Sequence, residues 1–350
     1  MCLSQEVSDQ LIAADLFSGS GAVTAALKHS GFNVVIAVDN DATACETYRL
    51  NHSEVSLYEG DIRKFRADKL SIPSGVDLLV VCAPCQPFSS QNRKRGKDSR
   101  AKLVLESIKF IRHLSPKLVF FENVPGLVSS QVFSKLSERL SRAEYRLSEA
   151  RMFDAADFGV PQRRNRCVLM ASKSEEAIAH FNNFTPKKVR KTVWEAIGDL
   201  PLIQSGEADP VDSLHKARSH KKIVLERLKY IPMDGGSRSS LPSDLCLPCH
   251  QRTGNNSFSD VYGRMRWHDV APTLTTGCTD LTKGRFVHPD QDRAITLREA
   301  AILQGFPRDY KFAGNSGAIA NQIGNAVPVG LVEGLALLMR QMIAMAPAKG

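Results

Sequence analysis

Short runs of hydrophobic residues recur along this chain, and most of them end at a turn. The clearest run covers residues 76–81, where five of the six residues are apolar and the last four are Leu or Val without alternation. An unbroken apolar run of this length is typical of a strand buried on both faces, as in a parallel sheet. The same reasoning predicts further strands at residues 11–17, 32–38, 55–58, 118–121 and 167–171.

The first predicted strand runs into a glycine turn, Ser18-Gly19-Ser20-Gly21, and a helix is predicted over residues 22–29. The next strand should end at Asp39, 20 positions after Gly19. Glycines let a backbone approach a nucleotide, and an acid at this spacing can accept from ribose hydroxyls. A dinucleotide fingerprint would place a third glycine where Thr24 stands, so the pattern favours an adenosine-type ligand without pyrophosphate. A purely structural glycine turn is the alternative.

The pattern changes along the chain. A helix is predicted at residues 101–113, but from about residue 174 to 286 apolar periodicity weakens and Pro and Gly are scattered. Ordered helical pattern returns at residue 296, and the last apolar helix, ending near Met345, is expected to pack onto the first domain. We therefore predict an α/β protein with a Rossmann-like sheet covered by helices on both faces, plus a smaller irregular domain. The predicted divisions are residues 1–175, 176–295 and 296–350.

Cys85 lies between Pro84 and Pro87, just past the end of the run at residues 76–81. In open α/β sheets, substrates bind at the carboxyl ends of the strands. The thiol could be a small buried residue under a loop, half of a redox pair with Cys82, or a thiolate nucleophile activated by a group elsewhere. Because Cys82 closes the strand and Cys85 follows it, the two thiols should differ in exposure, which disfavours the redox pair.

Other chemically capable groups follow neighbouring strands. Glu122 ends the strand at residues 118–121, on the same expected sheet edge as Cys85. A carboxyl group between an apolar strand and a turn can have a raised pKa, which suits proton donation, although a lone glutamate there is more often a cap. Arg164 and Arg166 alternate into the next strand and should share a face, where they could bind a carbonyl oxygen or a phosphate or form a surface salt-bridge patch.

Two polar turns are open to two interpretations. Asp61 follows a predicted strand and could contact an adenine edge, or simply begin an Asx-type turn. The basic loop at residues 90–98 follows Cys85 directly. It is either a solvated flexible loop or a lid that binds phosphates.

Composition limits the classes of protein. The chain has 350 residues, enough for a large core, and eight cysteines, too few for a secreted disulfide framework. The first ten residues carry Glu6 and Asp9 and lack the apolar segment of a signal peptide. No apolar stretch is expected to reach the roughly 18 residues that span a membrane. We expect a cytoplasmic protein.

Net charge favours a polyanionic partner, although a basic solvated surface is the alternative. The chain carries +9, and residues 186–285 contain 16 Lys and Arg against 11 Asp and Glu, a net of +5. The segment Cys246-Leu247-Pro248-Cys249-His250 is similar to a metal-binding or haem-attachment element. No second pair stands at zinc-like spacing, so no metal site is predicted.

Taken together, these segments resemble the DNA (cytosine-5)-methyltransferase family, of the compact bacterial type, over nearly the whole chain. Six segments match its motifs in order. They are Asp15-Leu16-Phe17-Ser18-Gly19-Ser20-Gly21, Pro84-Cys85-Gln86, Glu122-Asn123-Val124, Gln162-Arg163-Arg164-Asn165-Arg166, Arg298-Glu299 with Gln304-Gly305-Phe306-Pro307, and Gly324-Asn325-Ala326-Val327-Pro328. Two departures are small: Ala22 stands where a further glycine is usual, and Asp39 where glutamate is commoner.

The resemblance implies transfer of a methyl group from S-adenosylmethionine to carbon-5 of a cytosine flipped out of double-stranded DNA. Cys85 would add to carbon-6, which makes carbon-5 nucleophilic, and Glu122 would hydrogen-bond or protonate ring nitrogen 3. Arg166 would hold the carbonyl oxygen of the base, with Arg164 close by. The sequence does not identify the base that removes the carbon-5 proton.

The resemblance also implies binding residues. The expected cofactor residues are Phe17, Ser18, Gly19, Ser20, Gly21, Asp39, Asn40, Asp61, Ile62, Pro84, Asn325 and Ala326. The expected DNA contacts are Gln86, Ser89, Arg93, Arg95, Arg264, Arg266 and Thr273. The irregular domain would be the target-recognition domain, with its positive charge on phosphates and its polar side chains on base edges. The protein is expected to be a monomer, and a cognate restriction endonuclease could act separately.

Competing functions differ in their motifs. An exocyclic amino methyltransferase would place Asn or Asp before Pro-Pro-aromatic where Pro84-Cys85-Gln86 stands. A transfer-RNA cytosine methyltransferase would share the fold, but the long segment between the arginine motif and residue 296 favours DNA. A non-catalytic DNA-binding regulator and a thiol oxidoreductase using Cys82 and Cys85 are the alternatives from other classes.

Overall fold

The computed structural model describes residues 10–70, 72, 75–84, 99–247 and 260–347. The chain forms two compact units. The first, which we call the sheet unit, comprises Met1–Asp154, Asn165–Lys187 and Val329–Gly350, and the second, the irregular unit, comprises Ala155–Arg164 and Lys188–Pro328. These units are defined by which residues pack together. The functional division predicted at residues 175 and 295 stays a prediction.

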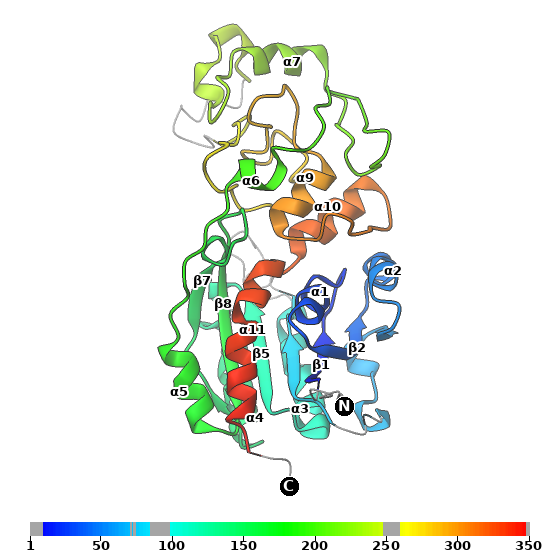
Figure 1. The fold of residues 1–350 in the computed structure, drawn as a ribbon, viewed down its shortest axis with the longest axis vertical. Coiled ribbons are helices and arrows are strands. Elements are labelled where there is room, and N and C mark those ends of the chain that lie inside the picture. The colour runs from blue at the N-terminus through cyan, green and yellow to red at the C-terminus, as the bar shows by residue number, and fades with distance from the viewer. Residues whose placement is uncertain (1–9, 71, 73–74, 85–98, 248–259, 348–350) are drawn as a thin grey trace, which may run out of the picture. The chain divides into compact units, whose positions relative to one another are not determined.

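The sheet unit is built on an eight-stranded sheet in the order β3-β2-β1-β4-β5-β8-β6, with β7 also paired to β8 (Figure 1). The first five strands are mutually parallel, and β8 runs antiparallel to β5, β6 and β7. This confirms the predicted Rossmann-like sheet. The strands are β1 (Ile12–Leu16), β2 (Asn33–Asp39), β3 (Ser56–Glu59), β4 (Leu78–Val81), β5 (Leu118–Asn123), β6 (Arg146–Leu147), β7 (Arg151–Asp154) and β8 (Asn165–Ser172).

Helices cover both faces of this sheet. Helix α11 packs against α1, α5 and β5, whereas residues of α3 and α4 join the hydrophobic cluster on the opposite face. Serine or aspartate side chains cap α2, α4 and α5 by accepting from a first-turn amide, which fixes where these helices begin. The helices are α1 (Ala22–His29), α2 (Ala42–Asn51), α3 (Ser107–Leu114), α4 (Gln131–Ser141), α5 (Glu175–Asn183) and α11 (Val329–Ala344).

Strand register decides which side chains share a face of the sheet. Leu16, Val81 and Phe121 belong to the cluster formed with α3 and α4. Asp15 pairs with Val80, which in turn pairs with Phe120, and side chains alternate along a strand. Asp15, Val80 and Phe120 therefore lie on the opposite face. Cys82 comes two positions after Val80, and Glu122 two positions after Phe120, so both belong to this face as well. The sequence pattern and the register together bring three ionisable groups to one side of one sheet edge.

The irregular unit contains helices but no regular strand among its described residues. Its helices are α6 (Val193–Ile197), α7 (Lys222–Lys229), α9 (Leu297–Gln304) and α10 (Ser316–Asn325). The described residues outside the helices form only isolated bridges, and the hydrophobic cluster around Leu228 and Val287 is small. The second unit is thus irregular, as its sequence pattern indicated, while the predicted domain bounds and the target-recognition role stay predictions. Buried apolar residues such as Met265, Phe286 and Leu303 occur along this unit, and polar contacts add to its order.

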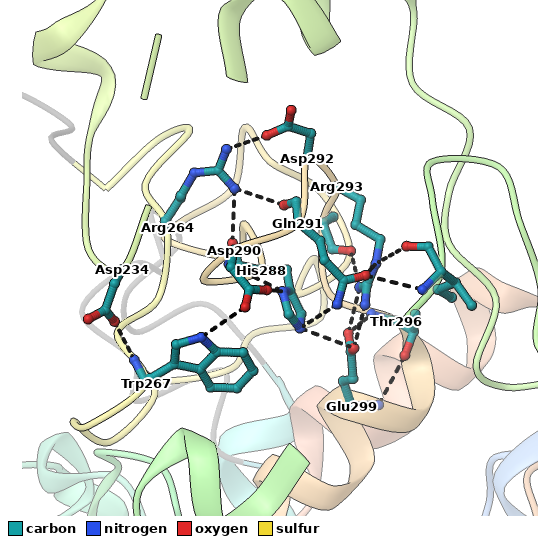
Figure 2. A network of polar contacts seen from close by, with 12 residues as sticks. Asp234, Arg264, Trp267, His288, Asp290, Gln291, Asp292, Arg293, Thr296 and Glu299 are labelled. Carbon is teal, nitrogen blue, oxygen red and sulfur yellow. Dashed lines mark hydrogen bonds and ion pairs between the residues drawn. The ribbon is translucent and has the colours of Figure 1, made fainter. Parts of the chain in front are cut away.

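Figure 2 shows such a polar network. Arg293 donates from both terminal nitrogens to Glu299, at 2.7 and 2.8 Å, and both side chains are buried. Glu299 also closes the capping box of α9 with Thr296. Burial would raise the pKa of Glu299, but the hydrogen bonds and charge of Arg293 hold it at about 2. The pair fixes the loop before α9 to the helix itself.

Two expectations need correction. Residues 99–106 form the 3-10 helix η4 (Ser99–Glu106), and the α-helix begins only at Ser107. The stretch Ser316–Ala344 is long and apolar enough to span a membrane by composition, contrary to the expectation that none would be. It forms two helices, α10 and α11, and 61% of its most apolar window is buried within the protein, as in an ordinary core helix.

Candidate active site

The glycine turn after β1 has an unusual backbone. Phe17, Gly19 and Gly21 have φ angles of 63°, 53° and 91°, in the left-handed region that favours glycine. The Phe17 and Ser18 amides donate to the Val38 carbonyl, which ties the turn to β2. The alternation of left-handed residues turns the chain sharply between β1 and α1.

Asp39, at the end of β2, is linked directly to this turn. Its Oδ2 accepts from the Gly19 amide at 2.8 Å and its Oδ1 accepts from the Asp41 amide at 2.9 Å, beside exposed Asn40. Burial raises the pKa of Asp39, opposed by these amide bonds. The predicted pairing of the acid with the glycine turn is thus present, and the carboxylate oxygens keep further acceptor capacity for hydroxyl groups.

Asp61 and Ile62 lie at the start of η1 (Ile62–Lys64), just after β3. Asp61 caps this turn and forms a bidentate pair with Arg63, whose hydrogen bonds lower the pKa of Asp61 to about 2. Ile62 is buried, and its carbonyl accepts from Lys109. Asp61 is therefore a turn residue in the local structure, which was the alternative interpretation. Its role in adenine binding stays a prediction.

Two buried polar atoms near the glycine turn have no hydrogen-bond partner: Oδ1 of Asp15 and the hydroxyl oxygen of Ser18. Burial raises the pKa of Asp15 to about 7, although a hydrogen bond from Thr24 opposes the shift. Unpaired buried acceptors are rare in folded proteins and point to a ligand that completes them. With the left-handed glycine turn and the Asp39 carboxylate, they fit an adenosine ligand that carries a cationic group.

Cys85 itself lies outside the described residues, as do Gln86, Ser89, Arg93 and Arg95. The chain is described up to Pro84, which is half-buried. Asn123, at the end of β5, donates from Nδ2 to the Ala83 carbonyl at 3.0 Å and accepts from the Val124 amide at 2.9 Å. This buried asparagine holds the backbone two residues before Cys85 against the strand that carries Glu122.

Glu122 and Arg166 form a buried ion pair, with Nε of Arg166 2.6 Å from Oε1 of Glu122. Both groups are largely buried, with 7% of the Glu122 side chain and 11% of the Arg166 side chain exposed. The pairing follows from register, because Glu122 lies opposite Val168 on β8 and Arg166 is two residues along the same face. Arg166 also donates to the Asn165 carbonyl at 2.8 Å, which restricts its guanidinium group. The structure therefore brings together two of the four predicted catalytic residues.

Cys82 is the neighbouring thiol on this face. Burial raises the pKa of Cys82 well above its ordinary value, and the charges of Glu122 and Asp15 raise it further. A thiol held protonated in this way is a poor nucleophile. This supports a structural role for Cys82.

Arg164 does not share a target with Arg166, so the expected pair of arginines on one face is wrong. Its NH1 group donates to the Leu274 carbonyl and its NH2 group to the Gly324 carbonyl, each at 2.7 Å. The side chain is buried, and the residue precedes β8 rather than belonging to it. Arg164 therefore ties backbone segments of the irregular unit together, and its contact with a base stays a prediction.

Asn325 and Ala326 lie at the C-terminal end of α10. Asn325 is exposed, and the Ala326 carbonyl accepts from Gln304 at 2.7 Å. Just before them, a Cβ on Gly324 would approach the Thr276 amide nitrogen to 2.5 Å, so only glycine fits beside that backbone. The motif is held rigidly within the irregular unit, and its role in cofactor binding stays a prediction.

The predicted DNA contacts divide into two groups. Arg266 is exposed, and exposed Thr273 donates to the Arg163 carbonyl at 2.7 Å. Arg264, by contrast, is 1% exposed, and the prediction that it contacts DNA is wrong. Its guanidinium donates to four backbone carbonyls, and its charge is paired with Asp292 (Figure 2).

The cysteine-rich segment is described only in part. Cys246 is half-buried with its thiol near the Leu241 carbonyl, whereas Cys249 and His250 lie outside the described residues. Among the residues that the structure describes, no group of three or more His, Cys, Asp or Glu could hold a metal ion.

Sequence reasoning missed two residues of this region. Asn123 was noted only as part of a motif, and its bond to the loop before Cys85 depends on strand pairing. Asp15 was noted only as the start of the glycine motif. A single acidic residue inside an otherwise apolar strand, Ile12–Leu16, is the signal that could have identified it, because a buried carboxyl group is rare without a purpose.

Comparison with known proteins agrees with this geometry. The family model described as C-5 cytosine-specific DNA methylase matches residues 12–340. The chain is 37% identical to the type II methylase M.HgiDII of Herpetosiphon aurantiacus, covering 94% of this chain and 95% of that protein. It is 30% identical to the type II methyltransferase M1.HphI of Haemophilus parahaemolyticus, covering 94% and 86%.

Solved structures show the same fold at lower identity. An Escherichia coli prophage protein described as a DNA modification methyltransferase superposes with a TM-score of 0.74 at 22% identity, covering 95% of this chain and 99% of that one. The Entamoeba histolytica methyltransferase EhMeth gives 0.63 at 18%, covering 95% and 98%. With the family match across nearly the whole chain, these findings establish that the protein belongs to the C-5 cytosine-specific DNA methylases, enzymes that use S-adenosylmethionine to methylate cytosine in DNA.

Proposed function

We propose that the protein methylates carbon-5 of a cytosine flipped out of a specific double-stranded DNA sequence, through a covalent bond between Cys85 and carbon-6. The Glu122–Arg166 ion pair carries the proposal, because it lies at the carboxyl end of the parallel strands, beside the strand that leads to Cys85. A stacked base cannot be attacked perpendicular to its ring, so the cytosine must leave the duplex.

The residues have separate tasks. The Cys85 thiolate adds to carbon-6, and the ring electrons move toward carbon-5 and ring nitrogen 3. Glu122 hydrogen-bonds or protonates nitrogen 3 and so offsets the developing charge, while Arg166 orients Glu122 and holds the carbonyl oxygen of the base. When bound, S-adenosylmethionine supplies an electrophilic methyl group. Removal of the carbon-5 proton and departure of the thiolate then restore the aromatic ring.

The cofactor residues follow from the glycine turn. Phe17, Ser18, Gly19, Ser20 and Gly21 would bind the methionine part, and Asp39 would accept from the ribose. Asn40, Asp61, Ile62, Pro84, Asn325 and Ala326 complete the proposed site. The two unpaired acceptors at Asp15 and Ser18 support this placement.

The irregular unit would select the DNA sequence. Its excess positive charge, with exposed Arg266 and Thr273, suits phosphate and base contacts. The similar proteins M.HgiDII and M1.HphI are type II enzymes, so we propose that this chain is the methylase of a restriction-modification system whose endonuclease acts separately. We further propose a cytoplasmic, nucleoid-associated monomer.

The test is to incubate the protein with S-adenosylmethionine and plasmid DNA or transfer RNA, and to analyse the digested nucleosides by mass spectrometry. The account predicts 5-methylcytosine in DNA and none in RNA, and bisulfite sequencing should place it at one recurring sequence. Formation of N4-methylcytosine, or methylation of RNA alone, would contradict the proposal. Cys85→Ser should abolish the product, and Cys82→Ser should retain a substantial fraction.

A further inference from the structure

Asp15 is a buried carboxyl group that the mechanism above does not use. Its side chain is fully buried in β1, and Oδ2 accepts from the Thr24 hydroxyl at 2.8 Å. The same hydroxyl is 2.8 Å from that of Tyr48, whereas Oδ1 of Asp15 has no partner. An unsatisfied buried carboxyl group destabilises the fold, so its presence calls for a function.

The groups around Asp15 come from every neighbouring element. Thr24 of α1 and, behind it, Tyr48 of α2 lie on one side. Asp39 of β2 contributes a second negative charge, and the carboxyl groups of Asp15 and Glu122 both act on the Cys82 thiol. Arg166 is already paired with Glu122. Among the described residues, the groups that act on the Asp15 carboxyl are the Thr24 hydroxyl and the Asp39 carboxylate, and neither carries a positive charge.

We propose that Asp15 distinguishes the methyl donor from its product by charge: below neutral pH the carboxyl group is protonated before the donor binds, and it releases its proton to solvent when the sulfonium arrives. The inference rests on the proposed cofactor site. The donor carries a positive sulfur, which becomes a neutral thioether once the methyl group has left. An ionised Asp15 would therefore stabilise the donor complex and leave the product complex with an unbalanced buried charge, which favours product release.

The pH dependence follows from the sign of the shift. Burial and Asp39 raise the pKa of Asp15 to about 7, against the hydrogen bond from Thr24. A bound cation lowers that pKa, so at lower pH the donor must displace a proton and binds less tightly. Donor affinity should therefore rise with pH up to about 7, by at most about tenfold per pH unit, and then become constant. Product affinity should vary much less.

Calorimetric titration of the full-length protein tests this, with S-adenosylmethionine and S-adenosylhomocysteine each titrated in buffers of different ionisation enthalpy. At pH 6 the donor should release most of one proton and the product close to none. Donor affinity should fall about fivefold to tenfold between pH 7 and pH 6. Equal proton release with both ligands, or none with either, would overturn the role of Asp15. Binding of neither ligand would instead contradict the cofactor site itself.

Asp15→Asn keeps the shape of the side chain and removes the ionisation. It should flatten the pH profile and reduce the preference for donor over product about tenfold, with little change in product affinity. Equal weakening of both ligands would show a merely structural role and overturn the proposal. Asp68→Asn, at an exposed carboxylate paired with Arg66, is the control and should change neither. If Asp15→Asn does not fold, the comparison of the two ligands on the unaltered protein decides.

Discussion

At the scale of single residues, arginines in the irregular unit do two different things. Arg264 and Arg266 are two positions apart, and in a strand they would point the same way. The chain there forms only an isolated bridge at Arg264, so Arg264 turns inward onto backbone carbonyls while Arg266 stays exposed. The sequence could not separate them, because residue type and spacing are the same for a structural and a DNA-binding arginine.

This difference predicts opposite effects of two substitutions. Arg264→Met removes a buried charge that is paired with Asp292 and should destabilise the protein by about 3 kcal/mol or more. Arg266→Met should leave the free energy of unfolding almost unchanged and weaken DNA binding. Urea unfolding followed by tryptophan fluorescence measures the first effect, since both tryptophans, Trp194 and Trp267, lie in the irregular unit. Equal stability of the two variants would contradict the structural role of Arg264.

At the scale of elements, sheet geometry explains most of what the sequence predicted correctly. Apolar runs without alternation identified the buried parallel strands, and the carboxyl ends of β1, β4 and β5 gather the ionisable groups at one edge. The contacts between strands could not be predicted, because they depend on register. Asn123 is the clearest case, since its bond to Ala83 joins two strands 40 residues apart in sequence.

Asn123→Ala should therefore slow catalysis without changing the fold. It removes a buried hydrogen bond, a loss of about 1–3 kcal/mol, and frees the backbone before Cys85. We expect a fall in kcat of about tenfold or more, with DNA affinity within about twofold of the parent. Single-turnover methylation and gel-shift titration measure the two quantities. A fall in DNA affinity with unchanged kcat would contradict this role.

The polar network before α9 predicts sensitivity to acid. His288 is buried beside Glu299, Arg293 and Asp290, and its ring contacts Trp267 (Figure 2). Burial lowers the pKa of His288 to about 4, against an ordinary 6.5. As pH falls, His288 is therefore protonated in the unfolded chain before it is protonated in the folded protein. The free energy of unfolding should be constant above pH 6.5 and decrease toward pH 4.

At pH 5 this effect should amount to about 2 kcal/mol relative to pH 7.5. Urea midpoints from tryptophan fluorescence at both pH values measure it. His52, buried in the sheet unit with a pKa lowered to about 4, titrates over the same range. His288→Gln isolates the contribution of His288, because the variant should lose less stability on acidification. An identical loss in both proteins would exclude His288 as a cause.

At the scale of the whole molecule, the order of the motifs identified the family, and no single motif could have done so. The fold class, the chemistry and the cofactor were accessible from sequence because six short motifs, each tied to a turn or strand end, occur in one order. The buried positions of Arg164 and Arg264 could not be predicted from the sequence, because burial in an irregular unit leaves no periodic signal. Net charge likewise indicates a polyanion without locating its contacts.

Charge predicts how DNA binding depends on salt. With a net charge of +9, the protein should bind DNA through several phosphate contacts, each of which releases counterions. The logarithm of the association constant should fall with the logarithm of salt concentration, with a slope of about −0.9 per contact. Arg266→Gln should make the slope shallower by about 1 if Arg266 binds a phosphate. A flat response would contradict the proposed basic surface.

The most direct measurement concerns the covalent bond itself. A duplex containing 5-fluorocytosine at the methylated position blocks release of the enzyme once the methyl group is transferred, because fluorine cannot leave as a proton does. With S-adenosylmethionine present, the protein should form a denaturation-resistant complex with this duplex, and peptide mapping should place the link at Cys85. A Cys82→Ser variant should be trapped and a Cys85→Ser variant should not. Failure of the parent protein to be trapped, or a link at any other residue, would contradict the account.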